Sequence, residues 1–311
     1  MKLVYMGTGS FAKGALEAIY NSGNEVALVV TQPDKPNSRR GKEIVFGEVK
    51  QFALDNNIAL YQPEKASSEE SVEYMKSFGA DVGVVCSYGQ LLKENLLNAF
   101  EFGCLNIHAS LLPKYRGAAP INRVIMDGEC ESGVTIMYMD KGLDTGDMMI
   151  SKSVEIADED TFGSLSEKLK EIGSELIIEG LKLLEEGCAP REKQDDSESN
   201  YAEKILKEDK YTDFSLPARE VFNHIRGMNP SPTAECRFGG KMIKLFDVAM
   251  CDEDFSDIDC AGTIISCDKK GMKVKCGSGA VIIKTLKPEG KGIMQANAFY
   301  NGIKDKSLKF E

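Results

Sequence analysis

An amide and an imidazole stand two positions apart in the segment CLNIHASLLPKYRGAAP, which covers residues 104–120. Asn106 and His108 have the same parity in an apolar run, so an extended backbone points both side chains to one face. His108 is one of only two histidines in the 311 residues. On this pattern alone, a satisfied core histidine beside a turn-capping asparagine explains the stretch as well as a functional site does.

A second polar segment, MDKGLDTGDMM at 139–149, follows another apolar run and holds Asp140, Asp144 and Asp147 among glycines. Aspartate in a glycine-rich turn is often only a turn former. At the end of a strand, however, it also stands at the edge where open α/β sheets bind their ligands. The segment is therefore a candidate edge of a site.

An amide, an imidazole and a carboxylate together suit acyl transfer to an amine. The carboxylate can accept the proton of the attacking amine, and the amide and imidazole can stabilise the oxyanion of the tetrahedral intermediate. The nearest serine, Ser110, falls in a turn, and no G-x-S-x-G elbow is present, which disfavours a covalent serine mechanism. Direct attack by the substrate's own amine fits better.

The elements that must position these groups follow the order of an α/β fold. KLVYM, EVALVVT, VGVVCS and CLNIHA are apolar throughout, which indicates strands buried on both faces of a parallel sheet. GVTIMYM and DMMISKSVEI follow as an expected antiparallel pair. Helices are expected over residues 10–23, 43–55, 68–77, 119–127 and 161–187. The pattern predicts a doubly wound, mostly parallel α/β domain over residues 1–189.

The remainder has a different character. Residues 190–207 are polar and unpatterned, which is typical of a connector. Over 208–311 a short helical stretch precedes short, glycine-punctuated apolar runs, which predict a small OB-like β-barrel. The runs are AECRF, KMIKLFDVAM, GTIISC, GMKVKCG and AVIIKTLKP.

Net charge is −11, which argues against a protein that coats nucleic acid non-specifically. From Lys207 onward, 17 Lys and Arg face 15 Asp and Glu, a net of +2 that leaves −13 for the rest. The carboxyl third is thus compatible with an anionic partner.

Targeting and metal signals are absent from the pattern. The amino terminus fits neither a signal nor a transit peptide, and no apolar run approaches the ~18 residues of a membrane span. Nine cysteines without a CxxC pair indicate buried, reduced thiols of a cytoplasmic protein, and a structural metal site is not expected. We expect a cytoplasmic protein.

A dinucleotide fingerprint is present only in part. Gly7, Gly9 and Ala12 fit GxGxxA after the first strand. The acidic residue that would bind a ribose should end the second strand, but that strand ends Val-Thr-Gln-Pro. We therefore interpret the glycines as a plain strand-to-helix turn rather than an NAD(P) site.

NIHASLLPKYRGAAPI together with DKGLDTGD resembles the formyltransferases that use 10-formyltetrahydrofolate. The branch that acts on methionyl initiator tRNA is the most similar, over nearly the whole chain. TQPDKP followed by RRGK resembles its inserted tRNA-contacting loop, and LPKYRGAAPIN the loop after its catalytic strand. KEDKYTDFSLPAREVFNHIRGMNPSP resembles its linker into the barrel, which is discriminating because glycinamide-ribonucleotide formyltransferases lack that second domain.

The resemblance implies an enzyme that moves a formyl group from 10-formyltetrahydrofolate to the α-amino group of methionine on initiator tRNA. It implies Asn106, His108 and Asp144 as catalytic residues. The implied folate contacts are Ser110, Leu111, Leu112 and Pro113 in one turn, and Tyr88, Gly89, Gln90 and Leu91 in another. The implied tRNA contacts lie in the 32–42 loop, at Lys35, Arg39, Arg40 and Lys42. The expected protein is a monomer without a metal.

Some positions depart from the family pattern. The family usually has Pro and an acidic residue at Gly9 and Ser10, Trp at Phe214 and Ser231, and Gly at Thr233. Three alternatives stay open: a formyltransferase acting on a sugar-nucleotide amine, the amino-terminal region of a 10-formyltetrahydrofolate hydrolase or dehydrogenase, and a non-catalytic RNA-binding module. The linker match and the basic loop disfavour the first two. The intact Asn, His and Asp disfavour the third.

Overall fold

The computed structural model describes residues 1–34, 46–253, 255 and 260–311. The chain forms two compact units that interleave along the sequence. The first unit consists of Met1–Gly117, Ser132–Val154 and Ser166–Tyr201, and the second consists of Ala118–Glu131, Glu155–Leu165 and Ala202–Glu311.

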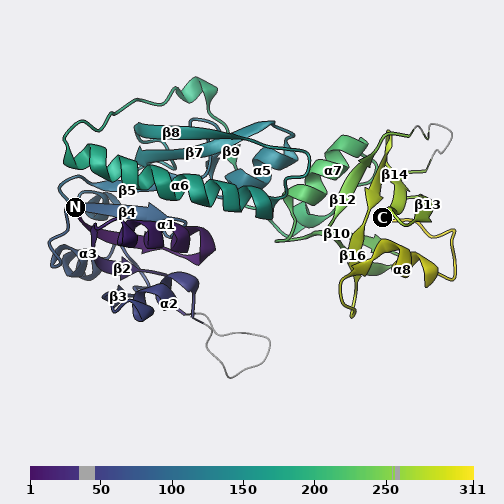
Figure 1. The fold of residues 1–311 in the computed structure, drawn as a ribbon, viewed down its shortest axis with the longest axis horizontal. Helices are drawn as coiled ribbons and strands as arrows, with labels where there is room; N and C mark the ends of the chain where they lie inside the picture. The colour runs from purple at the N-terminus through teal and green to yellow at the C-terminus, as the bar shows by residue number, and fades with distance from the viewer. Residues whose placement is uncertain (35–45, 254, 256–259) are drawn as a thin grey trace. The chain divides into compact units, whose positions relative to one another are not determined.

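The first unit is built on a seven-stranded sheet in the order β3-β2-β1-β4-β5-β7-β8 (Figure 1). The five strands from β3 to β5 pair in parallel, and β7 pairs antiparallel with β5. The mostly parallel, doubly wound sheet predicted from the sequence is confirmed. Its strands are β1 (Lys2–Gly7), β2 (Glu25–Val30), β3 (Leu60–Tyr61), β4 (Val82–Cys86), β5 (Cys104–His108), β7 (Glu131–Tyr138) and β8 (Met148–Glu155). Two short strands are β6 (Arg116–Gly117) and β9 (Tyr201–Ala202).

Among the described residues, the helices that accompany this sheet are α1 (Gly9–Asn21), α2 (Glu48–Asp55), α3 (Glu69–Lys76), α4 (Glu94–Leu97) and α6 (Phe162–Glu185). α1 and α6 lie side by side on one face of the sheet (Figure 1). A glycine lets α6 approach β5, because a Cβ at Gly173 would lie 3.0 Å from Ile107 Cγ2. The expected helix over 43–55 begins only at Glu48. The short α4 was not predicted, because four residues carry no helical period.

The second unit contains two four-stranded sheets, ordered β10-β11-β16-β17 and β12-β15-β14-β13, in which every pairing described is antiparallel. This arrangement is consistent with the predicted small barrel. The strands are β10 (Ala234–Phe238), β11 (Lys241–Leu245), β12 (Val248–Cys251), β13 (Ile264–Asp268), β14 (Gly271–Lys275), β15 (Ala280–Ile283), β16 (Thr285–Pro288) and β17 (Met294–Gln295). The helices are α5 (Pro120–Met126), α7 (Ala218–Gly227) and α8 (Ala296–Asn301).

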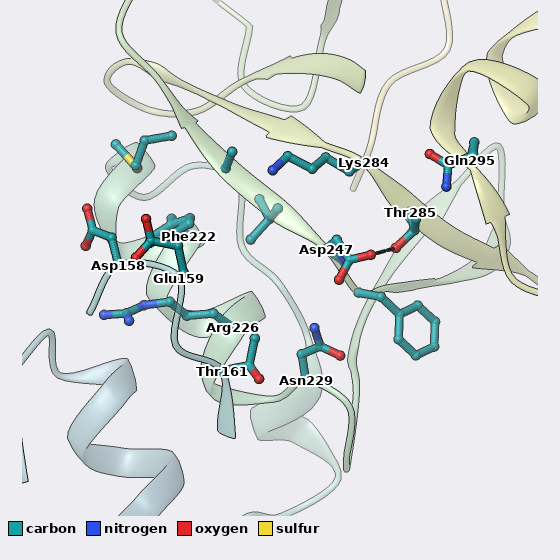
Figure 2. Close-up of a pocket in the computed structure, with 14 residues that line it drawn as sticks. Asp158, Glu159, Thr161, Phe222, Arg226, Asn229, Asp247, Lys284, Thr285 and Gln295 are labelled. Atoms are coloured by element: carbon teal, nitrogen blue, oxygen red, sulfur yellow. Dashed lines mark hydrogen bonds between the residues drawn. The ribbon is translucent and has the colours of Figure 1, made fainter. Parts of the chain in front are cut away.

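Two of the predicted barrel strands are each divided into two strands in the structure, so the prediction of a single strand is wrong in both cases. KMIKLFDVAM is not one strand but two, β11 and β12, which belong to different sheets, and AVIIKTLKP divides in the same way into β15 and β16. The two breaks meet at a corner, where the Thr285 hydroxyl donates to Asp247 Oδ2 over 2.6 Å and the Asp247 N–H donates to Thr285 Oγ1 over 3.1 Å (Figure 2). Apolar periodicity continues through such a corner and therefore hides it.

All nine cysteines are free thiols, as expected, but the expectation that they are buried is wrong for Cys130, Cys188 and Cys260, which are exposed, and for Cys267, which is half-buried. Burial raises the pKa of Cys86 and of Cys104 to about 12. In the part of the chain that the structure describes, no helix combines the length and apolarity needed to span a bilayer.

Candidate active site

Asn106 and His108 end β5, in the middle of the sheet, with β4 and β7 on either side. Both side chains are buried, with 9% and 5% of their surface exposed. Both also contact Asp144, which places them on one face of the strand, as their equal parity predicts. The strand therefore presents an amide and an imidazole together at its carboxyl end.

Asp144 comes from the 139–147 loop, which joins β7 to β8. Its Oδ1 accepts a hydrogen bond from Asn106 Nδ2 over 3.3 Å, and its Oδ2 accepts one from the Gly117 N–H over 2.9 Å. His108 Nδ1 lies 3.7 Å from the same Oδ2. Three side chains from two separate segments thus converge, as the sequence led us to expect.

The other ring nitrogen of His108 settles which tautomer the neutral ring adopts. Nε2 lies 2.9 Å from the carbonyl oxygen of Tyr115. A carbonyl can only accept, so Nε2 carries the hydrogen. The lone pair of the neutral imidazole is therefore on Nδ1, which faces Asp144.

The turn after β5 is held by a residue that nothing in the sequence singles out. The fully buried Thr135, opposite His108 in β7, donates its hydroxyl to the Ser110 carbonyl over 2.8 Å and accepts from the Leu112 N–H over 3.2 Å. The Ser110 hydroxyl donates to the Lys114 carbonyl over 2.6 Å. It is engaged within its own turn, which argues against a role as nucleophile.

The turn after β4 contains the second set of expected folate contacts. Tyr88 is 2% exposed, and its hydroxyl has no hydrogen-bond partner among the described residues. Burial raises the pKa of Tyr88 to about 12. Leu91 is 74% exposed. The Gln90 amide is occupied elsewhere, because its Oε1 accepts from the Ala66 N–H over 2.8 Å and its Nε2 donates to the Pro63 carbonyl over 3.1 Å.

The hydrogen-bond and ion-pair partners given for Asp140 and Asp147 are residues other than Asn106 and His108. The Asp140 carboxylate accepts from the Gly142 N–H over 2.9 Å and from the Thr145 hydroxyl over 2.6 Å, so it acts as a turn former. Asp147 lies 3.9 Å from Arg191. Of the three aspartates in the segment, it is Asp144 that is placed beside His108 and Asn106.

The expected tRNA contacts Lys35, Arg39, Arg40 and Lys42 lie outside the described residues. Among the residues that are described, no group of three or more His, Cys, Asp or Glu side chains is placed to hold a metal ion. A separate pocket of about 540 Å³ lies in the second unit, beside the Asp247–Thr285 corner (Figure 2). None of the catalytic candidates lines it.

Comparison with known proteins places this geometry in a family. A family model described as formyl transferase matches residues 1–181, and one described as formyl transferase, C-terminal domain, matches residues 204–304. The two matches define a formyl transferase that carries the additional carboxyl-terminal domain.

Sequence relatives identify the branch of the formyl transferases to which the chain belongs. Proteins called methionyl-tRNA formyltransferase are 43% identical over 303 residues in Clostridioides difficile and 39% identical over 302 residues in Fusobacterium nucleatum, with 97% of both chains covered in each case. That of Lachnospira eligens is 42% identical over 307 residues, with 97% of this chain and 96% of the relative covered. The chain belongs to the methionyl-tRNA formyltransferase family.

Solved structures share the fold at lower identity. HypX from Aquifex aeolicus in complex with tetrahydrofolic acid is 16% identical with a TM-score of 0.67, over 96% of this chain and 46% of that one. An N-formyltransferase from Helicobacter canadensis in complex with folinic acid and dTDP-3-aminofucose is 19% identical with a TM-score of 0.68, over 91% of this chain and 98% of that one.

Proposed function

We propose that this protein transfers a formyl group from 10-formyltetrahydrofolate to the α-amino group of methionine esterified to initiator tRNA. The product is the formylmethionyl-tRNA used to initiate translation. The observation that carries the proposal is the convergence of Asn106 and His108 on Asp144 at the carboxyl end of β5, with Asn106 Nδ2 3.3 Å and His108 Nδ1 3.7 Å from the carboxylate. Family membership supports the choice of donor and acceptor.

Asn106 stabilises the oxyanion in this proposal. The methionyl amine attacks the formyl carbon, a C–N bond forms, and the carbonyl electron pair moves to oxygen. An amide nitrogen has two hydrogens, and Asp144 accepts one of those on Asn106 Nδ2. The second hydrogen on Nδ2 can donate to the oxyanion. Stabilisation of the oxyanion is typically the largest single contribution to catalysis of acyl transfer.

His108 accepts the proton of the attacking amine at Nδ1. The imidazolium that forms lies between the carbonyl of Tyr115 and the carboxylate of Asp144, and both favour its charge. The Nδ1–H then donates to N10 of the folate as the C–N10 bond breaks and tetrahydrofolate leaves. Asp144 thus acts through His108, and Nδ1 becomes a donor only once the ring is protonated.

The folate lies, in this proposal, against two turns. One consists of Ser110, Leu111, Leu112 and Pro113, and the other of Tyr88, Gly89, Gln90 and Leu91. Support for the first comes from the anchoring of its backbone by Thr135. Because the Gln90 side chain is held by the 63–66 segment, the contribution of residue 90 is a backbone one.

The acceptor tRNA contacts the 32–42 loop through Lys35, Arg39, Arg40 and Lys42, which supply salt-dependent affinity for phosphates.

We assign catalysis to residues 1–189, a connector to 190–207 and further tRNA contacts to a barrel over 208–311. The family matches over 1–181 and 204–304 support this division. The protein acts as a monomer in the cytoplasm, where its acceptor is found.

The test is a formyl-transfer assay with 10-formyltetrahydrofolate and four acceptors: methionyl initiator tRNA, uncharged initiator tRNA, free methionine and a sugar-nucleotide amine. Formylation of the charged tRNA alone is the expected result, and Asn106→Ala should lower its kcat by about 100- to 1,000-fold. Preferred formylation of the sugar-nucleotide amine would replace the proposed acceptor. Binding of tRNA without formyl transfer to any acceptor would indicate a non-catalytic RNA-binding module.

A further inference from the structure

Gln194 lies in the polar segment after α6, and its side chain joins the two loops of the candidate active site. Its Nε2 donates to the Asp144 carbonyl over 2.9 Å and to the Gly146 carbonyl over 2.7 Å. Its Oε1 accepts from Arg116 Nε over 2.9 Å. We propose that Gln194 is a positioning residue that holds Asp144 at its working distance from His108 and Asn106. This inference rests on the proposed function of Asp144.

The loop that carries Asp144 is restrained from within by the Asp140 carboxylate, which accepts from the Gly142 N–H and the Thr145 hydroxyl, but its tip is exposed. Lys141, Gly142 and Leu143 are exposed, and Asp144 itself has φ +54°, in the left-handed region that few side chains favour. Both hydrogens of the Gln194 amide go to this loop, one to the residue that carries the carboxylate. Gln194 therefore adds a restraint from outside the loop to those that Asp140 supplies within it.

Arg116 extends the link to the other loop. Its side chain is 3% exposed, its Nε donates to Gln194 Oε1, and its Nη2 donates to Asp196 Oδ1 over 2.8 Å. The next residue is Gly117, whose N–H donates to Asp144 Oδ2. Gln194 thus links the backbone of Asp144 to the side chain of Arg116. Arg116 in turn precedes Gly117, whose N–H donates to the Asp144 carboxylate. Asp144 is therefore held at its backbone by Gln194 and at its carboxylate by Gly117.

Gln194 is itself anchored on both sides. Two residues earlier, Glu192 exchanges backbone hydrogen bonds of 2.9 and 2.8 Å with Met148, at the start of β8. Six residues later, the Asn200 carbonyl accepts from the Arg116 N–H over 3.1 Å, and its side chain accepts from the Tyr115 N–H. A fixed backbone places the amide, so this part of the expected connector is a component of the site.

The test compares Gln194→Glu and Gln194→Met with wild type in steady-state formylation of methionyl initiator tRNA. Glutamate keeps an acceptor for Arg116 but loses both donors to the 139–147 loop, whereas methionine loses both functions. We expect kcat to fall about 10- to 100-fold in both variants, because a misplacement of about 1 Å has this cost. KM for folate and for tRNA should stay within about threefold. Asp195→Ala is the matched control, because that carboxylate bonds only within its own turn, to Ser197.

Amide exchange of Gly117 gives a readout without activity. Its N–H is bonded to Asp144 Oδ2, so it should exchange faster in both Gln194 variants and at the wild-type rate in Asp195→Ala. Near wild-type kcat in Gln194→Glu with a loss only in Gln194→Met would show that Gln194 merely supports Arg116, and would overturn the inference. Unchanged Gly117 exchange would also overturn it. A wild-type protein that does not formylate would refute the proposed function instead, while the exchange result would still report the positioning.

Discussion

His108 donates its Nε2–H to the carbonyl oxygen of Tyr115, seven residues further along the chain, over 2.9 Å. The bond fixes the ring's tautomer and orientation from the side away from Asp144. Because Tyr115 itself has φ +58°, the turn after β5 is bent to bring this carbonyl under the ring. The lone pair on Nδ1 is left facing the carboxylate at 3.7 Å, so a proton bound at Nδ1 would lie beside Asp144.

Replacing Asp144 by Asn should remove most of the activity while keeping the shape of the side chain. Without the carboxylate, the imidazolium formed during transfer loses its charged partner, and kcat should fall about 100- to 10,000-fold. The matched control is Asp140→Asn in the same loop, whose carboxylate is a turn former. Steady-state kinetics on both variants decide the matter. A larger loss of kcat at Asp140 than at Asp144 would contradict the assignment.

The sequence was informative where chemistry needs an unusual residue type at a strand end. Asn106 and His108 stood out for that reason, whereas only the family resemblance distinguished Asp144 from Asp140 and Asp147. The apolar runs of β1, β2, β4 and β5 predicted the sheet. Gln194 and Thr135 did not stand out, because their partners are mainly backbone carbonyls and N–H groups, which leave no pattern in the sequence. Three-dimensional placement alone reveals such roles.

The barrel corner illustrates a second limit. A run such as KMIKLFDVAM is apolar enough for one strand, and nothing in it marks the point at which the chain passes from one sheet to the other. The turn depends on Asp247, whose partner Thr285 is 38 residues away. The local pattern of apolar residues carries no information about a hydrogen bond between residues so far apart in the sequence. The same holds for Gln90, whose partners lie in the 63–66 segment.

Arg39 and Arg40 should contribute to binding of the acceptor tRNA but not to the chemistry. In the Arg39→Ala/Arg40→Ala double variant we expect a raised KM for methionyl initiator tRNA, an unchanged kcat, and a weaker salt dependence. The slope of log KM against log salt should fall by up to about 1.8, or about 0.9 for each phosphate that the protein no longer neutralises.

The control for this pair removes two other exposed charges, in Lys76→Ala/Lys182→Ala. Lys76 lies near Glu73 on its own helix, and Lys182 lies near Glu186, the residue after the end of α6. The control should leave both KM and its salt slope unchanged. Equal slopes in wild type and in the arginine variant would count against a phosphate-binding role for the loop.

His224, the second histidine, should make the stability of the second unit depend on pH. Its Nε2 donates to the Asp209 carbonyl over 2.7 Å, and its Nδ1 lies 3.3 Å from the Thr212 hydroxyl. Burial lowers the pKa of His224 below its usual 6.5. The unfolded chain then binds a proton more readily than the folded one, so the stabilisation is complete above pH about 6.5 and is lost as pH falls below it.

Denaturant unfolding of wild type and His224→Gln between pH 5 and 8 measures this contribution. The free energy of unfolding of wild type should decline from pH about 6.5 downward, and the decline should be shallower in the variant, which cannot titrate there. Parallel curves for the two proteins would show that other groups cause the decline.

The family resemblance led us to expect glycine at the position of Thr233, and the backbone there has a conformation that favours glycine. Its φ is +76°, in the left-handed region that is unfavourable for a β-branched residue. Two hydrogen bonds hold it there: its N–H donates to the Met228 carbonyl over 2.8 Å, and its hydroxyl donates to the Pro230 carbonyl over 2.7 Å. Both Thr233→Gly and Thr233→Ala lose the hydroxyl, so comparing the two variants isolates the backbone.

Thr233→Gly should be more stable than Thr233→Ala by about 1 kcal/mol, because a Cβ in this region costs about 1–2 kcal/mol. The control is Glu220, exposed in α7, where the helical backbone should reverse the order and make Ala more stable than Gly. Thermal or urea unfolding of the four variants gives both differences. If alanine were the better residue at both positions, the positive φ of Thr233 would not hold in solution.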